Sequence, residues 1–313
     1  FMAVCWTDFI QGIMMFFAIV IVPAFAMYVM GGVETSLNAI DIVNPTFFNP
    51  FMNPDGSTIS FIAFISLMGW GLGYFGQPHI LVRFMAISST SELKRSKRIA
   101  VGWYSISMIA AVFVGMVGNV YLTETLNGPD VEKVLLIMTE KLFDPFVGGL
   151  ILSAVLAAIM STASSQLLVA ASAFSQDFYR SVIRQDASHT ELVWVSRVAV
   201  LIISAMAISL AMNPNSFILE MVAYAWAGFA ATFGPAVLMS LFWRRTTRNG
   251  VLAGIVVGGV TVLVWKQLAL FGLYEIIPGF FFGLLAIYIV SLLDKEPSKE
   301  ITDLFDAVER SNI

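Results

Sequence analysis

The sequence has little cysteine, histidine or charge. Cys5 is the one cysteine among 313 residues, which excludes an internal disulfide and a cysteine-rich metal site. The two histidines, His79 and His189, are separated by most of the chain, which argues against a zinc site. Charged residues make up 12% of the chain and hydrophobic residues 58%, against about 25% and 45–50% in soluble domains. We therefore predict an all-α integral membrane protein with several lipid-embedded helices.

Other classes of protein are disfavoured by what the sequence lacks. The net charge is −4 and there is no basic block, so nothing indicates a nucleic-acid partner. The sequence shows no convincing nucleophile, metal cluster or acid/base pair, so we do not expect an enzyme. An apolar segment begins at Phe1 without a positively charged leader. We read this start as part of a longer polypeptide and not as a signal peptide.

Hydropathy divides the chain into membrane spans. Stretches of about twenty residues with few charges are long enough to cross a hydrocarbon core of about 30 Å. We predict eight such helices, at residues 4–31, 58–86, 99–122, 146–174, 192–212, 217–243, 251–270 and 274–293. All Lys and Arg residues except Lys133, Lys141 and Lys266 then fall on one side of the membrane, which the positive-inside rule makes cytoplasmic. Both ends of the chain, including the polar tail 294–313, are expected on that side.

The second predicted span contains the sequence GWGLGYFGQP, from Gly69 to Pro78. Four glycines and a proline in one apolar run should break the helix and free backbone groups at membrane depth. Secondary transporters use such breaks to form substrate and ion sites. A glycine-lined packing face with a proline kink explains the same pattern equally well.

The fourth predicted span carries a cluster of hydroxyl groups near its middle. The carbonyl of Ala158 and the hydroxyls of Ser161 and Thr162 share one helix face and present three neutral oxygens, ligands that suit a hard cation. By spacing alone, packing is the stronger reading, because Ser and Thr in membrane helices commonly bond the carbonyl four residues back.

A few further polar and aromatic residues lie in the predicted spans. Asp8 lies near the cytoplasmic end of the first span, where it is either a functional carboxylate or an acid at the start of a helix. Arg83 and Arg197 are expected to reach the cytoplasmic surface, so we assign them no role beyond indicating the orientation of the spans. For the aromatic run 224–229 in the sixth span we favour packing over the lining of a cavity.

These segments resemble the sodium:solute symporter family, and within it the members that transport proline. The resemblance runs almost from the first residue to the last. It is carried by residues 3–12, 66–80, 158–162, 166–169, 224–229 and 272–280.

The resemblance implies a transporter core of ten helices in two inverted five-helix repeats, with extra helices at the ends. Residues 1–31 would be the last helix of the first repeat, and residues 58–243 the whole second repeat. Residues 251–293 would form two peripheral helices. The missing amino-terminal portion of the same polypeptide would then complete the site.

The resemblance also assigns roles to individual residues. It implies a sodium site at Ala158, Ser161 and Thr162, with Asp8 on the path by which sodium leaves toward the cytoplasm. It places the substrate on the broken helix. The substrate-binding residues it implies are Trp70, Tyr74 and Pro78, which would lie along one stripe if that segment stays locally helical.

The function implied is sodium-coupled uptake of L-proline across a bacterial cytoplasmic membrane by alternating access. Na⁺ is the coupling ion, and lipid, sodium and L-proline are the partners. Two alternatives remain: a symporter of the same family for another small organic solute, and a transporter-like membrane sensor. The short tail after Asp294 argues against the sensor.

Overall fold

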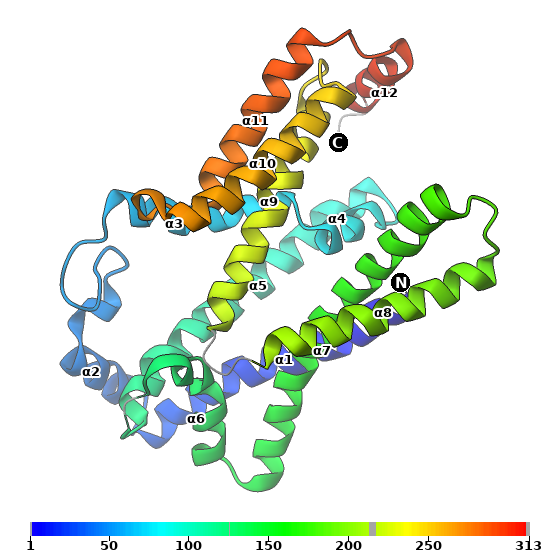
Figure 1. Cartoon of the computed structure of the whole chain (residues 1–313). Helices are drawn as coiled ribbons and strands as arrows, with labels where there is room; N and C mark the ends of the chain where they lie inside the picture. Colours follow the sequence, from blue (N-terminus) through cyan, green and yellow to red (C-terminus); the bar gives the residue numbers. More distant parts are fainter. Residues whose placement is uncertain (1, 125, 213–216, 311–313) are drawn as a thin grey trace. The chain divides into compact units, whose positions relative to one another are not determined.

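The regular structure of the chain is helical. The computed structural model describes residues 2–124, 126–212 and 217–310, and all the regular elements in these ranges are helices (Figure 1). The chain divides into two compact units. Unit 1 comprises Phe1–Gly56 and Arg95–Phe217, and unit 2 comprises Ser57–Lys94 and Ile218–Ile313.

Unit 1 is built around the long helices α1 and α7, which pack against each other. α7 also contacts α6 and α8. Asp144 begins α7 by accepting hydrogen bonds from the backbone N–H groups of Phe146 and Val147, at 3.0 and 3.3 Å. The elements of the unit are α1 (Met2–Val29), α2 (Val33–Val43), η1 (Pro45–Phe48), most of α5 (Thr90–Tyr121), η3 (Gly128–Lys133), α6 (Val134–Leu142), α7 (Pro145–Ser172), the π-helix η4 (Ala173–Ile183) and α8 (His189–Ala211).

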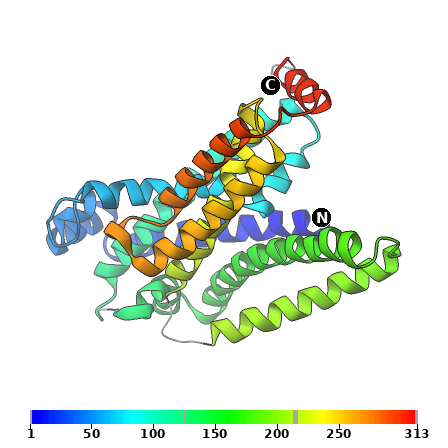
Figure 2. The same ribbon diagram turned by 45° about the horizontal axis from the view of Figure 1, so that its top comes forward.

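Unit 2 is built around α9, α10 and α11, which lie side by side in both ribbon views (Figures 1 and 2). Glycines allow this close approach: a Cβ added at Gly258 of α10 would lie 2.1 Å from the carbonyl oxygen of Ala231 in α9. The elements of the unit are α3 (Phe61–Gly69), the 3₁₀-helix η2 (Trp70–Phe75), α4 (Pro78–Met85), α9 (Ile218–Phe242), α10 (Arg248–Leu268), η5 (Leu270–Gly272), α11 (Ile276–Leu293) and α12 (Lys299–Arg310).

The helices agree with the predicted spans. Among the described residues, seven helices are long and apolar enough to cross a membrane: Met2–Val29, Thr90–Tyr121, Pro145–Ile183, His189–Ala211, Ile218–Phe242, Arg248–Leu268 and Ile276–Leu293. The chain is thus an all-α, multi-pass membrane protein. The second predicted span is the one that forms no single long helix. α3 ends at Gly69, η2 follows, and α4 begins at Pro78, so the predicted break is confirmed.

Several elements were not expected from the sequence. α2 and α6 lie in what we read as connections between predicted spans. α7 continues into the 11-residue π-helix η4. The predicted polar tail contains the helix α12. The division into repeats at residues 1–31, 58–243 and 251–293 stays a prediction. The cytoplasmic placement of residues 294–313 stays a prediction as well.

Candidate functional site

In unit 1, Asp8 of α1 meets the hydroxyl cluster of α7. Ser161 Oγ donates a hydrogen bond to Asp8 Oδ1 at 2.8 Å, and Ser165 Oγ donates to Oδ2 at 3.2 Å. The two serines are four residues apart, so they project from the same side of α7. Asp8 and Ser161, which the resemblance gave separate roles, are therefore in direct contact.

Ala158 and Thr162 lie on the same side of α7. In an α-helix the carbonyl of residue 158 bonds the N–H of residue 162 and keeps a second lone pair. Ala158 is half-buried, whereas Thr162 is exposed in unit 1. Ser161 donates its one proton to Asp8, so both lone pairs of its hydroxyl are available to a cation.

The hydroxyl cluster extends beyond the predicted residues. Ser165 is buried, and Ser164 Oγ donates to the carbonyl oxygen of Ser161 at 3.1 Å. The groups gathered here are hydroxyls, carbonyls and one carboxylate, all of them hard oxygen ligands. Within the described ranges, no three His, Cys, Asp or Glu side chains form a group that could hold a metal ion. Such an oxygen set suits a hard cation.

In unit 2, Trp226 of α9 holds the broken segment. Its Nε1 donates to the carbonyl oxygen of Trp70 at 3.0 Å, one of the backbone groups near the break. The Trp70 and Trp226 rings stack at 5.4 Å between centroids and 14° between planes. Buried Gln77 Nε2 donates in turn to the carbonyl oxygen of Trp226 at 3.4 Å. The run 224–229 serves both of the roles considered for it. Trp226 packs on the broken segment, and other residues of the run line a pocket of about 460 Å³, namely Tyr224, Ala225, Gly228 and Phe229.

The stripe expected for Trp70, Tyr74 and Pro78 does not form as an α-helical stripe. η2 is a 3₁₀-helix, in which residues four apart differ by about 120° around the axis instead of about 40°. Both aromatic residues nevertheless contact Trp226, since Tyr74 meets its ring edge-on at 5.1 Å. Pro78 is the first residue of α4. Tyr74 is 40% exposed, so it has open surface for a ligand, whereas the Trp70 ring stacks on both Trp226 and Tyr274.

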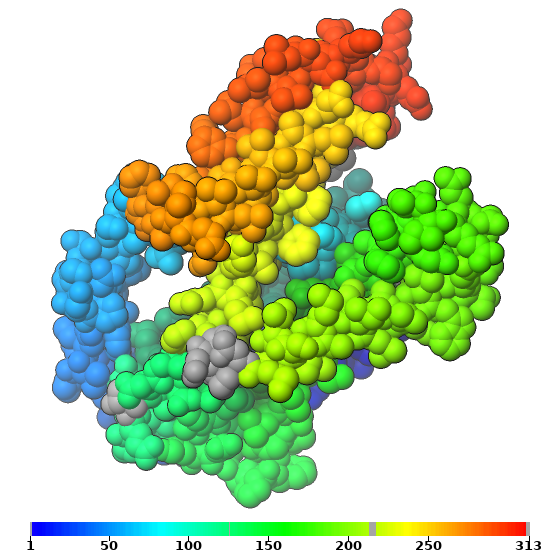
Figure 3. Space-filling view, viewed as in Figure 1, coloured from blue at the N-terminus to red at the C-terminus, as the bar shows by residue number. Residues whose placement is uncertain are grey.

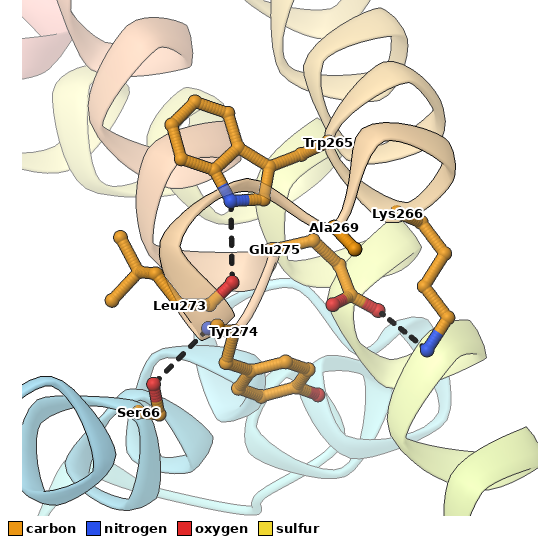
Figure 4. Close-up of a pocket in the computed structure, with 8 residues that line it drawn as sticks. Ser66, Trp265, Lys266, Ala269, Leu273, Tyr274 and Glu275 are labelled. Atoms are coloured by element: carbon orange, nitrogen blue, oxygen red, sulfur yellow. Dashed lines mark hydrogen bonds and ion pairs between the residues drawn. The ribbon is translucent and has the colours of Figure 1, made fainter.

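A pocket of about 260 Å³ lies beside this aromatic group (Figure 4). Tyr274 lines it, and the Tyr274 ring stacks on Trp70 at 6.5 Å and 21°. The Tyr274 backbone N–H donates to Ser66 Oγ at 3.1 Å, which joins the start of α11 to α3. On the other wall, Lys266 Nζ lies 3.9 Å from the carboxylate of buried Glu275.

The phenol of Tyr274 is a fixed donor. Its hydroxyl donates to the carbonyl oxygen of Ala223 at 2.6 Å. Burial, and to a smaller degree the negative charge of Glu275, raise the pKa of Tyr274 far above its usual range. The phenol therefore keeps its proton at any physiological pH and holds Tyr274 against Trp70.

The predicted residues thus form two groups, one in each unit. Asp8, Ala158, Ser161 and Thr162 lie in unit 1, and Trp70, Tyr74 and Pro78 lie in unit 2. Sequence reasoning missed Ser165, Trp226 and Tyr274 as members of these groups. Ser165 could have been found, because it follows Ser161 by one helical turn.

Known proteins resemble the chain along nearly all of its length. The sequence model of the sodium:solute symporter family matches residues 1–258. The high-affinity proline transporter PutP of Bacillus subtilis (strain 168) is 48% identical over 310 residues, covering 98% of this chain and 64% of the relative. The sodium/proline symporter of Escherichia coli (strain K12) is 47% identical over 310 residues, covering 97% of this chain and 61% of the relative. The chain thus spans a little under two thirds of the length of these relatives.

A solved structure shares the fold. The structure of a Na⁺-coupled sialic acid symporter superimposes on this chain with a TM-score of 0.73 at 20% sequence identity. The match covers 95% of this chain and 63% of the symporter chain. The family match over residues 1–258 and the relatives at 47–48% identity agree with the resemblance seen in the sequence. The chain belongs to the sodium:solute symporter family.

Proposed function

We propose that this chain is part of a sodium-coupled symporter that carries L-proline into the cell by alternating access. The observation that carries the proposal is the 47–48% identity, over 97–98% of the chain, to relatives named for proline transport. Those relatives are transporters by name, which supports a function without covalent chemistry.

The sodium site of the proposal consists of the Ala158 carbonyl and the hydroxyls of Ser161 and Thr162. The hydrogen bond from Ser161 to Asp8 supports the second part of the proposal, in which Asp8 draws the ion toward the cytoplasm. Neutral ligands bind a monovalent cation weakly enough for release, whereas a cage of carboxylates would hold it or favour divalent ions.

The solute site of the proposal lies at Trp70, Tyr74 and Pro78. A pyrrolidine ring packs well on an aromatic face, and its secondary ammonium gains about 0.5–2 kcal/mol of cation–π stabilisation when it is desolvated. The exposed surface of Tyr74 supports this role directly. Trp70 contributes through its stack with Trp226, which fixes the position of the broken segment.

Transport by this scheme requires sodium and proline to stabilise the same conformation, so that each raises the affinity for the other by the same factor. We place the protein in the bacterial cytoplasmic membrane with both ends of this chain inside, by the distribution of Lys and Arg. We propose that the amino-terminal portion implied by the resemblance supplies the remaining ligands; the relatives at 47–48% identity are longer than this chain.

The test is uptake of radiolabelled proline by the full-length protein in proteoliposomes, with and without a sodium gradient. Accumulation that needs the gradient supports the proposal. Sodium-driven uptake of another solute with no uptake of proline would identify a different substrate. No sodium-driven uptake of any solute, in a protein that still binds proline, would favour a membrane sensor.

A further inference from the structure

The helix α12 has one apolar side. Ile301 and Leu304 are 56% and 67% exposed, while Phe305 is half-buried. Spacing of three and four residues places these side chains within one arc of the helix. Asp303 lies on the opposite side. The apolar side consists of Ile301, Leu304, Phe305 and Val308.

An ion pair joins α12 to the loop between α9 and α10. Arg244 forms a two-pronged ion pair with Asp306, with Nε to Oδ1 at 2.7 Å and a terminal guanidinium nitrogen to Oδ2 at 3.0 Å. Arg245 donates to the carbonyl oxygen of Asp294 at 2.7 Å, which holds the segment that leads into α12. The helix therefore has a fixed place beside this loop.

That loop marks the end of the membrane spans. It joins α9, which ends at Phe242, to α10, which begins at Arg248, and both helices are apolar enough to span. Trp243 packs on Tyr288 of α11 with ring centroids 5.0 Å apart. Trp and Tyr are enriched where a span meets the lipid headgroups. α12 (red in Figure 3) is held at this level by the two arginines.

We propose that α12 is an interfacial helix, with its apolar side inserted at the boundary between the lipid headgroups and the acyl chains of the membrane that the spans cross. A helix with one apolar and one charged side lies in the plane of this boundary. Four acidic residues against two basic ones make α12 anionic. Apolar burial, and not attraction to anionic lipid, is therefore the driving force.

Spin labels test this placement in the full-length protein. Cys5 and any other cysteine are replaced by serine, and a nitroxide is attached to Leu304→Cys, Ile301→Cys or, as the matched control on the other side, Asp303→Cys. The protein is reconstituted in vesicles of phosphatidylcholine, alone and mixed with phosphatidylglycerol. Power saturation then compares collisions with oxygen, which is concentrated in lipid, and with a water-soluble nickel complex.

We expect labels at 301 and 304 to lose nickel accessibility and gain oxygen accessibility relative to 303, equally in both kinds of vesicle. Nickel accessibility at 304 equal to that at 303 would overturn the proposal. So would a label at 304 that is immobilised and shielded from both reagents, since that pattern indicates a protein partner. Insertion only in vesicles that contain phosphatidylglycerol would overturn apolar burial as the cause. Circular dichroism and elution volume show that each labelled variant is folded.

Discussion

The hydroxyl of Ser161 serves two groups at once in the proposed cycle. It donates its proton to Asp8 at 2.8 Å, and its oxygen keeps two lone pairs that a cation could use. A carboxylate behind a hydroxyl increases the electron density on that oxygen without binding the ion itself. A cation would thus be held by neutral ligands and still feel the charge of Asp8.

Removing one hydroxyl should weaken sodium activation. Interactions with a charged group are worth about 1.5–3 kcal/mol, so Ser161→Ala and Thr162→Ala should each raise half-saturating sodium by about 10–150-fold. Thr162→Ser keeps the oxygen and should be mild. The measurement is proline uptake against sodium concentration, normalised to protein in the membrane. Parental sodium dependence in both alanine variants would restore the reading that these hydroxyls only pack.

Loss of an aromatic face should act on the solute instead. Tyr74→Ala and Trp70→Ala should raise half-saturating proline by about 5–200-fold, because such a face contributes about 1–3 kcal/mol. Trp70→Ala also removes the stack on Trp226, so Tyr74→Ala is the cleaner variant. Uptake is measured against proline concentration at saturating sodium. Unchanged half-saturation in both variants would remove these residues from the solute site.

Among the elements, η2 contains two glycines that differ in the space around them. A Cβ at Gly73 would lie 1.6 Å from Trp226 Nε1, whereas a Cβ at Gly71 would meet nothing within 4 Å. Gly73→Ala should therefore displace the segment from α9 and destabilise the protein by at least the usual overpacking cost of about 1–3 kcal/mol. Gly71→Ala, the matched control, should have little effect. Thermal unfolding in detergent compares the two, and equal melting temperatures would show that η2 does not lie against Trp226.

The ion pair between Arg244 of the α9–α10 loop and Asp306 of α12 should depend on pH. The hydrogen bond from Arg244, and then its charge, hold the pKa of Asp306 below the ordinary 3.8. Because the folded pKa is lowered, the ion pair contributes fully above the ordinary value and is lost as the pH falls through the lowered one. A nitroxide at Leu304→Cys should become more mobile over that acidic range. In Asp306→Asn the same label should be mobile already at neutral pH and show no transition.

The long helices could be predicted from the sequence because apolar length alone defines them. The break could also be predicted, since glycine and proline act locally. The helix α12 was not predicted because its charged side lowers the mean hydropathy of any window that covers it. The π-helix η4 has no compositional signature. The pairing of Trp226 with Trp70 joins residues 156 positions apart, and one sequence gives no measure of such contacts.

At the scale of the whole molecule, the 313-residue chain should not transport by itself. It covers 61–64% of the length of its transporter relatives, and alternating access needs both repeats around a shared site. Co-expression of the amino-terminal portion as a separate polypeptide should restore part of the activity, because inserted helices can associate afterwards. Sodium-driven proline accumulation in proteoliposomes measures both cases. Robust uptake by the chain alone would show that its own helices form a complete pathway.

The pairing of η2 with α9 also sets an order of events during synthesis. Trp70 leaves the ribosome 156 residues before Trp226, the residue whose indole bonds its carbonyl. At about 5–20 residues per second, this interval lasts about 8–30 s. During that time the broken helix has no α9 to bond its free backbone groups, and lipid cannot replace it. The nascent segment must therefore wait in the insertion machinery or against earlier helices until α9 arrives.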